Sequence, residues 1–246
     1  MIQLSGWALT LGASSGFGEA ASLALARAGL NIFGVHLDRK ATMPNAERIT
    51  AEIKALGRQA VFFNINAADA EKRAEVAGQM AHVLEERGES GTLRVLLHSL
   101  AFGTLKLYVA DPMKEAVTQA QMDMTLDVMA HSLVYWTQEV VGRGLMTRGG
   151  RIYAMTSSGG TRVLPFYGPV SAAKAALESH IRQLASGARA ARHHRERHPR
   201  RRDRHARPAE DPEARLDHRR GTAAQPQRTH DHDRGRRAGD RRAVPP

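Results

Sequence analysis

The residues with the clearest chemical potential are a tyrosine and a lysine separated by six residues, Tyr167 and Lys174. They lie in the stretch from Tyr153 to Leu184, at the start of an amphipathic helical pattern. A nearby ammonium stabilises a phenolate, so this pair suits general acid catalysis at an oxygen on which negative charge develops. The same residue types also occur singly on loops and solvated helix faces. The elements that would position the pair therefore decide between these interpretations.

A glycine-rich turn near the start of the chain indicates a nucleotide site. The apolar run at 6–11 leads into GASSGFG, and a helical pattern follows. Glycines there let the backbone turn tightly and approach a pyrophosphate at the positive end of the helix. The spacing G-x-x-x-G-x-G differs from the commoner G-x-G-x-x-G, so the turn needs support from a second strand. The residues of the turn that we expect to bind a cofactor are Gly12, Ser14, Ser15, Gly16, Phe17 and Gly18.

That second strand is predicted at 31–38, with two cations after it. A carboxylate at the end of this strand would accept the ribose hydroxyls of NAD, whereas Arg or Lys would pair with the 2′-phosphate of NADP. Asp38 is followed by Arg39 and Lys40, so both types are present. We expect NADPH as the cofactor, with NADH as the alternative.

The rest of the pattern alternates strands and helices. Helices are predicted at 46–57, 70–87 and 118–145, and strands within 60–69, within 93–103 and at 151–158. This alternation predicts an α/β fold, a Rossmann-like doubly wound parallel sheet in three αβα layers. Because ligands bind at the carboxyl ends of such strands, we expect Asn66, Ser99 and Leu100 to line the cofactor site.

Length and composition fit one large soluble domain. The chain has 246 residues and no cysteine, which excludes disulfides and thiolate metal sites. It has no run of eighteen apolar residues. We expect a cytoplasmic protein with no membrane segment and no bound metal.

The net charge of +11 is concentrated in residues 187–246, which hold eighteen Arg and nine acidic residues but no Lys. The only large aliphatic side chains there are Leu216 and Val244. Such a segment buries too little apolar surface to offset the entropy of ordering it. We predict a folded domain at 1–186 and a disordered tail at 187–246. A basic arm that binds nucleic acid is the alternative interpretation.

The Arg, His, Asp, Ala and Pro of this tail are also what GC-rich DNA gives when it is translated in a wrong frame. A shift of one base turns a His codon into one for Ile, Met or Thr, and a CGN Arg codon into one for Gly, Ala, Val, Asp or Glu. Within those limits, Arg192 to Ala206 becomes GITVNAIRAGVTDTP, which has the pattern of a sixth strand and its glycine turn. We predict that the tail is read out of frame.

Together, the glycine turn, the strand order and the Tyr/Lys pair resemble the short-chain dehydrogenase/reductase superfamily over residues 1–186. Most members have Tyr-x-x-x-Lys, but here the residue four after Tyr167 is Ser171 and Lys174 follows three residues later. The Tyr-x6-Lys spacing is similar to that of enoyl-acyl-carrier-protein reductases, and so is the run His98 to Phe102, HSLAF. Met129 stands where most superfamily members have a helix asparagine, which fits the same branch.

The resemblance implies NADPH-dependent reduction of trans-2-enoyl thioesters, carried on acyl carrier protein or coenzyme A, in fatty acid biosynthesis. It assigns Tyr167 as the acid and places Lys174 on the nicotinamide ribose beside it. It also implies a homotetramer. Ser157 stands in the superfamily's serine position, where many enoyl reductases have a tyrosine, and Leu11 stands where Thr is usual. Ser157 is therefore an accessory hydrogen-bonding candidate, and an NADP-dependent 3-oxoacyl or carbonyl reductase is the alternative enzyme.

Overall fold

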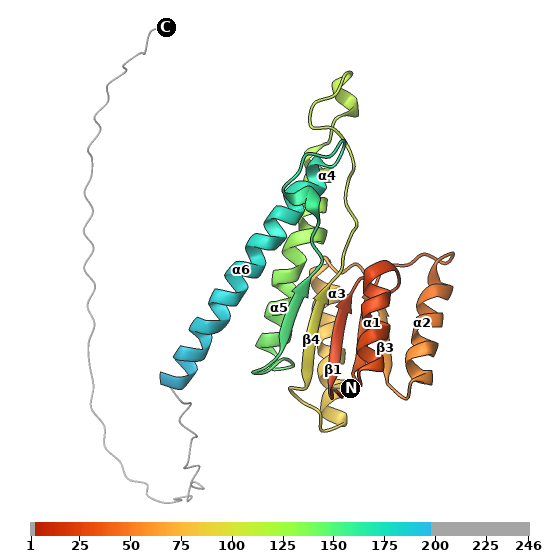
Figure 1. Cartoon of the computed structure of the whole chain (residues 1–246), viewed down its shortest axis with the longest axis vertical. Coiled ribbons are helices and arrows are strands. Elements are labelled where there is room, and N and C mark those ends of the chain that lie inside the picture. The colour runs from red at the N-terminus through yellow and green to blue at the C-terminus, as the bar shows by residue number, and fades with distance from the viewer. Residues whose placement is uncertain (1–2, 198–246) are drawn as a thin grey trace, which may run out of the picture. The chain divides into compact units, whose positions relative to one another are not determined.

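The computed structural model describes residues 3–197, with the side chains of residues 3–186. Within them, five parallel strands form one sheet in the order β3-β2-β1-β4-β5 (Figure 1). The strands are β1 (Trp7–Leu11), β2 (Asn31–His36), β3 (Ala60–Asn64), β4 (Leu93–His98) and β5 (Arg151–Ala154). The reversal of strand order between β1 and β4 is the topological switch point at which doubly wound sheets bind ligands. The predicted fold class is confirmed.

Helices cover both faces of the sheet, and two apolar clusters mark the two layers. On one face, α1 (Gly16–Arg27) and α2 (Met43–Ala55) bury Leu23, Ile49 and Ile53 against β1 and β2. On the other face lie α3 (Ala70–Glu86), α5 (Ser132–Gly142) and the first half of α6 (Gly168–Arg197). There the Trp7 and Phe33 rings stack with centroids 4.1 Å apart within the larger cluster. No helix in the described part of the chain is long and apolar enough to cross a bilayer.

The predicted helix at 118–145 is helical from residue 119 to residue 142, with a π-turn in its middle. It consists of α4 (Gln119–Leu126), a π-turn η2 (Asp127–His131) and α5, which ends at Gly142. Thr118 starts α4 through a capping box with Gln121. At the π-turn, the Ser132 hydroxyl donates to the Val128 carbonyl oxygen at 2.8 Å. Such side-chain bonds to the preceding turn bend helices, and π-turns are frequent at functional sites.

Two predicted strands are shorter than expected. β2 ends at His36 rather than Asp38, because the Asp38 amide donates to the side-chain oxygen of Asn64 and not to the β3 backbone. β5 ends at Ala154 rather than at 158, and the chain turns at Ser158–Gly160. The predicted boundary at 186 falls within α6 and stays a prediction, as does the tail, since residues 198–246 lie outside the described residues.

Candidate active site

The glycine turn between β1 and α1 is shaped by close backbone contacts. Gly12 has a φ of +85°, and a Cβ on it would lie 2.5 Å from the Ser99 carbonyl oxygen. A Cβ on Gly18 would collide with the Gly12 carbonyl oxygen. Ser15 precedes α1 in an extended conformation, and its side chain makes no capping bond to the helix. The turn therefore brings bare backbone and a helix N-terminus to the switch point, as a pyrophosphate site requires.

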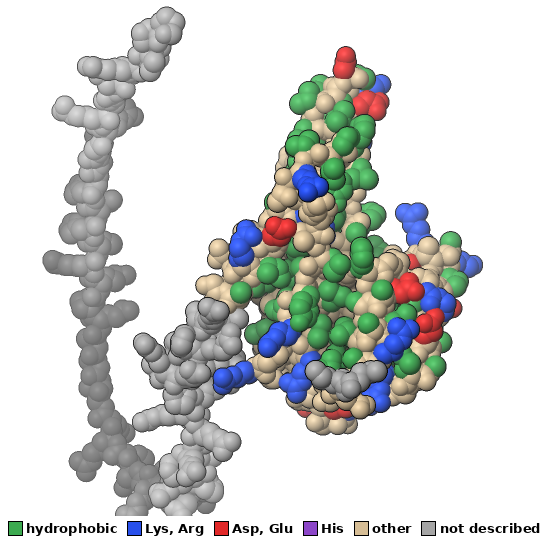
Figure 2. Space-filling model, in the orientation of Figure 1, with side chains coloured by type: hydrophobic (Ala, Val, Ile, Leu, Met, Phe, Trp, Pro, Cys, Tyr) green, Lys and Arg blue, Asp and Glu red, His purple; other side chains and the backbone are tan. Residues whose placement is uncertain are grey.

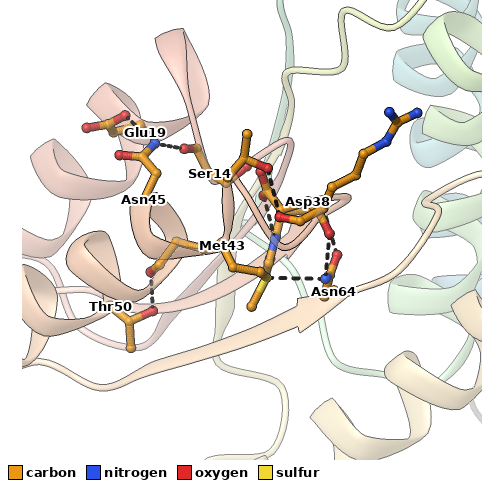
Figure 3. A network of polar contacts seen from close by, with 11 residues as sticks. Ser14, Glu19, Asp38, Met43, Asn45, Thr50 and Asn64 are labelled. Carbon is orange, nitrogen blue, oxygen red and sulfur yellow. Dashed lines mark hydrogen bonds and ion pairs between the residues drawn. The ribbon is translucent and has the colours of Figure 1, made fainter.

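Asp38 is held in a polar network beside this turn (Figure 3). The His36 Nδ1–H donates to Asp38 Oδ2 at 2.8 Å, and the Asn64 side chain pairs with the Asp38 backbone. Burial acts to raise the pKa of this carboxyl. Hydrogen bonds from Ser14, Thr42 and His36 outweigh burial and hold the pKa below its ordinary value. Asp38 is therefore a fixed carboxylate at the end of β2.

Arg39 and Lys40 follow Asp38 and are exposed. A hollow of about 550 Å³ opens beside them, lined by Ser14, Ser15, Asp38, Ala41, Thr42, Pro44, Asn45 and Arg48. The Asn45 amide donates to the Ser14 carbonyl oxygen, and Arg48 pairs with Glu19 of α1 at 2.5 Å. Asn45 and Arg48 were not predicted to lie here, and their only signal in the sequence is their spacing on one face of α2.

The other predicted cofactor residues are divided between two places. Ser99 and Leu100 follow β4 directly against the glycine turn, and the Ser99 amide donates to the Leu11 carbonyl oxygen at 2.9 Å. Phe17 is 73% exposed at the start of α1. The exposed Asn66 instead bonds locally, with its side-chain oxygen accepting from the Ala68 amide at 3.0 Å. All of these assignments stay predictions.

Tyr167 and Ser157 come together at the carboxyl end of β5. The Tyr167 hydroxyl donates to Ser157 Oγ at 3.2 Å, and Ser157 Oγ also accepts from the Gly159 amide at 3.1 Å. The Tyr167 ring lies against Gly159 so closely that a Cβ there would collide with it. Tyr167 stands immediately before α6, so the phenol is fixed by the helix start on one side and by a glycine on the other.

Lys174 projects from the second turn of α6 into the same region and is only 5% exposed. Its ammonium donates to the Met155 carbonyl oxygen at 2.7 Å and to the Leu100 carbonyl oxygen at 3.4 Å. Burial lowers the pKa of Lys174, and no described carboxylate forms an ion pair with it. Lys174 is thus held by backbone carbonyls, one of them from Met155, two residues before Ser157, and the joint role of Tyr167 and Lys174 stays a prediction.

Exposed apolar side chains are concentrated on two loops, the one after β4 and the one that leads into Tyr167 and α6. They gather on the end of the molecule that carries α4 and the neighbouring loops (Figure 2). Tyr108 of one loop packs so closely on Gly168 that a Cβ there would lie 2.7 Å from the Tyr108 ring. The exposed members are Phe102, Leu105, Leu107, Tyr108, Val109, Met113, Val163, Leu164 and Phe166.

Comparison with known proteins gives related families and folds. Residues 12–193 match the family described as Enoyl-(Acyl carrier protein) reductase. The chain is 35% identical over 100 residues to the NADH-dependent enoyl-[acyl-carrier-protein] reductase FabI of Nostoc sp., covering 41% of this chain and 37% of that protein. The corresponding Synechocystis enzyme is 37% identical over 100 residues, which cover 39% and 36% of the two chains. The chain thus spans little more than a third of the length of these relatives.

Among solved structures, a short-chain dehydrogenase from Burkholderia cenocepacia in complex with NADP is 26% identical, with a TM-score of 0.62 over 74% of this chain and 68% of that one. A short-chain alcohol dehydrogenase from Sinorhizobium meliloti is 25% identical, with a TM-score of 0.64 over 77% and 69%. The family match includes the glycine turn, Ser157 and the Tyr/Lys pair. The chain belongs to the enoyl-(acyl carrier protein) reductase family of the short-chain dehydrogenase/reductase superfamily.

Proposed function

We propose that the protein reduces the double bond of trans-2-enoyl thioesters with NADPH. The observation that carries this proposal is that both residues bond to the segment just after β5, the Tyr167 hydroxyl to Ser157 and the buried Lys174 ammonium to the Met155 carbonyl oxygen. The Tyr-x6-Lys spacing and the family match favour the enoyl branch over other reductases. The apolar surface around Tyr167 fits a substrate with an acyl chain.

The residues present fit a nicotinamide dinucleotide. The turn between Gly12 and Gly18 has no room for a Cβ at either of these two positions, so the backbone there carries no side chain. Lys174 is a buried cation whose described partners are two carbonyls, which leaves a third N–H direction for a ribose hydroxyl. Ser14 and Asn64 border the ribose end through the Asp38 network.

The bound cofactor supplies the hydride, and the chain supplies the proton and the positioning. Reduction at the β-carbon leaves negative charge on the thioester oxygen. Tyr167 donates its hydroxyl proton or a hydrogen bond to that oxygen, and Ser157 Oγ orients the phenol. The Lys174 ammonium stabilises the phenolate that remains.

The preference for NADPH depends on the end of β2. Arg39 and Lys40 are exposed beside the hollow at Asp38, where a 2′-phosphate would meet them. The Nostoc relative is named as an NADH enzyme, and the Burkholderia structure contains NADP, so the family includes both cofactors. The fixed carboxylate of Asp38 disfavours the phosphate, and the two cations favour it.

A 3-oxoacyl or carbonyl reductase is the second candidate, and one contact favours it. The Tyr167–Ser157 hydrogen bond gives two hydroxyls at one site, which suits a carbonyl oxygen that receives the proton directly. The two functions use the same residues and differ in the carbon that accepts hydride.

We propose further that residues 187–246 are read out of frame. The family match ends at residue 193. The sequence that a shift of one base gives, from Arg192 onward, has the pattern of a strand and a glycine turn; we call it the reread sequence, and the chain that carries it the frame-restored chain. Sequencing the coding DNA across the codons for Ala185 to Arg192 tests this directly. An unbroken frame that encodes the same arginines in several independent clones would refute it.

The function is tested by assaying the chain, and the frame-restored chain beside it, with NADPH and matched thioesters. Crotonyl and longer 2-enoyl thioesters should be reduced faster than the corresponding 3-oxoacyl thioesters. A strong preference for the 3-oxoacyl substrate would instead establish the carbonyl reductase. Activity restored only by the reread sequence would show that the region after residue 186 completes the site.

A further inference from the structure

His98 is a buried polar residue to which the proposed chemistry assigns no role. It is the last residue of β4, its side chain has no exposed surface, and its Nε2 lies 2.9 Å from Ser132 Oγ. Ser132 is the first residue of α5, immediately after the π-turn η2. The contact therefore joins the end of a central strand to the residue that follows the π-turn η2.

The hydrogen bonds of Ser132 fix the tautomer of His98. A hydroxyl has one proton to donate, and the Ser132 hydroxyl donates it to the Val128 carbonyl oxygen at 2.8 Å. Ser132 Oγ must then accept from His98 Nε2–H. The opposite ring nitrogen, Nδ1, carries a lone pair and is buried with no hydrogen-bond partner among the described residues.

The imidazole is neutral in this environment. Burial, and then the charge of Lys174, lower the pKa of His98 to about 3. A second proton on the ring would place an imidazolium close to the Lys174 ammonium in the protein interior. His98 is therefore a neutral donor throughout the pH range in which an enzyme of this type acts.

Both carbonyls that hold Lys174 depend on the backbone next to His98. The His98 carbonyl oxygen accepts from the Met155 amide at 2.9 Å, and the Met155 carbonyl oxygen accepts from the Lys174 ammonium at 2.7 Å. The second carbonyl, that of Leu100, lies two residues after His98 on the same segment. A shift at the end of β4 would move both acceptors together.

The π-turn on the other side of His98 packs against the helix that carries Lys174. Val128 and Met129 share a core cluster with Val170 and Ala173 of α6. The His98–Ser132 bond thus lies between the carbonyls that bind the ammonium and the surface on which its helix rests.

We propose that His98 is a positioning residue for Lys174. Its Nε2–H bond to Ser132 holds the end of β4 against the π-turn, and so fixes the Met155 and Leu100 carbonyls at the ammonium. The proposal rests on the role given to Lys174 under the proposed function. It does not depend on which thioester is the substrate.

Two substitutions separate this role from packing alone. His98→Gln places an amide N–H at the position of Nε2 and keeps the bond to Ser132, whereas the shorter amide of His98→Asn does not reach it. Ile53→Val is the control, since it removes one methyl from the apolar cluster on the opposite face of the sheet. The readout is the titration of the Lys174 amine, followed by NMR in lysine-labelled full-length protein below the melting temperature of every variant.

In His98→Asn the pKa of Lys174 should shift upward, because a loosened ammonium gains access to water, while His98→Gln and Ile53→Val should keep the wild-type titration. If the reductase activity is as proposed, kcat/KM should fall on the order of 10²-fold in His98→Asn and recover in His98→Gln. An unchanged Lys174 titration in His98→Asn would overturn the positioning role. If the frame-restored chain is also inactive while the Lys174 shift is present, the proposed function is refuted and this inference stands.

Discussion

The two halves of the site are built by different means. Around β1 and β2, the cofactor half is shaped by main chain: glycines without room for a Cβ, and ladder bonds such as those from the Gly12 and Ala13 amides to Val35. Around β4, β5 and α6, the catalytic half depends on side chains, and Tyr167, Ser157, Lys174 and His98 each have few partners. The cofactor half should therefore be sensitive to added atoms, and the catalytic half to removed ones.

The largest effect should come from removing one oxygen in the catalytic half. Tyr167→Phe keeps the ring against Gly159 but deletes the hydroxyl that faces Ser157. In the frame-restored chain, we expect turnover to fall by roughly 10²–10⁴-fold, the range for loss of a general acid, with little change in cofactor binding or melting temperature. Steady-state kinetics and NADPH titration measure the two quantities. Full activity in the variant would show that Tyr167 is not the acid.

Lys174→Ala is the matched comparison in that half. It should weaken both turnover and cofactor binding, because the ammonium is proposed to meet the ribose as well as the phenol. Should binding stay at the wild-type level, Lys174 would not contact the cofactor.

Acid should distinguish the halves by the pH at which each loses stability. The pKa of His98 is lowered to about 3, by burial first and then by Lys174, and burial followed by His131 lowers the pKa of His180. The ordinary pKa of histidine is near 6.5. At pH values below it, the unfolded chain binds protons at these two histidines, whereas the folded chain leaves them neutral. The free energy of unfolding should fall by about 1.4 kcal/mol per pH unit for His98 alone.

Asp38 in the cofactor half has the opposite character. Its carboxyl is stabilised in the charged form, so its contribution is present above the ordinary Asp value and is lost only as the pH falls below about 3.8. Between pH 6.5 and 4, the change in the free energy of unfolding measured with urea should therefore come from the histidines of the catalytic half. His98→Gln should flatten that slope, and His82→Gln, which removes an exposed histidine of α3, should not. Equal slopes in both variants would show that His98 is not responsible.

Added atoms test the cofactor half. Gly18→Ala places a methyl against the Gly12 carbonyl oxygen, whose backbone position is fixed by β1. Overpacking of this kind costs about 1–3 kcal/mol, and here it should displace the turn that binds pyrophosphate. Gly16→Ala is the control, because a Cβ there meets nothing within 4 Å and has only the strain of a φ of +56°. Calorimetry with NADPH should rank Gly18→Ala below Gly16→Ala in affinity.

The same contrast explains what could be predicted from the sequence. Glycine spacing and apolar alternation report local geometry, so β1, the turn and α1 lie almost where expected, as does the fold they imply. The π-turn at Asp127–His131 depends on contacts of Ser132 with Val128 and His98. The hydrophobic periodicity of the sequence carries no information about these contacts. Asn45 and Arg48 were missed for a similar reason, since they act across α1 and α2. The Tyr/Lys pair was singled out by its residue types and spacing, the resemblance then gave it a role, and that role stays a prediction.

The smallest effect should be the loss of cofactor preference in Arg39→Ala/Lys40→Ala. Both side chains are exposed, so each contact with a 2′-phosphate would be screened by salt and should contribute only modestly. The double variant should bind NADPH more weakly, by an order of magnitude or less, while its affinity for NADH stays unchanged. Because Asp38 remains charged beside the ribose, the variant should approach equal affinity for the two cofactors. Raising the salt concentration should reduce the NADPH preference of the wild type towards that of the variant, since both changes remove the same attraction. If the preference for NADPH survives both the substitution and high salt, the 2′-phosphate must be bound instead by Arg48 and Asn45 of α2, whose side chains line the same hollow.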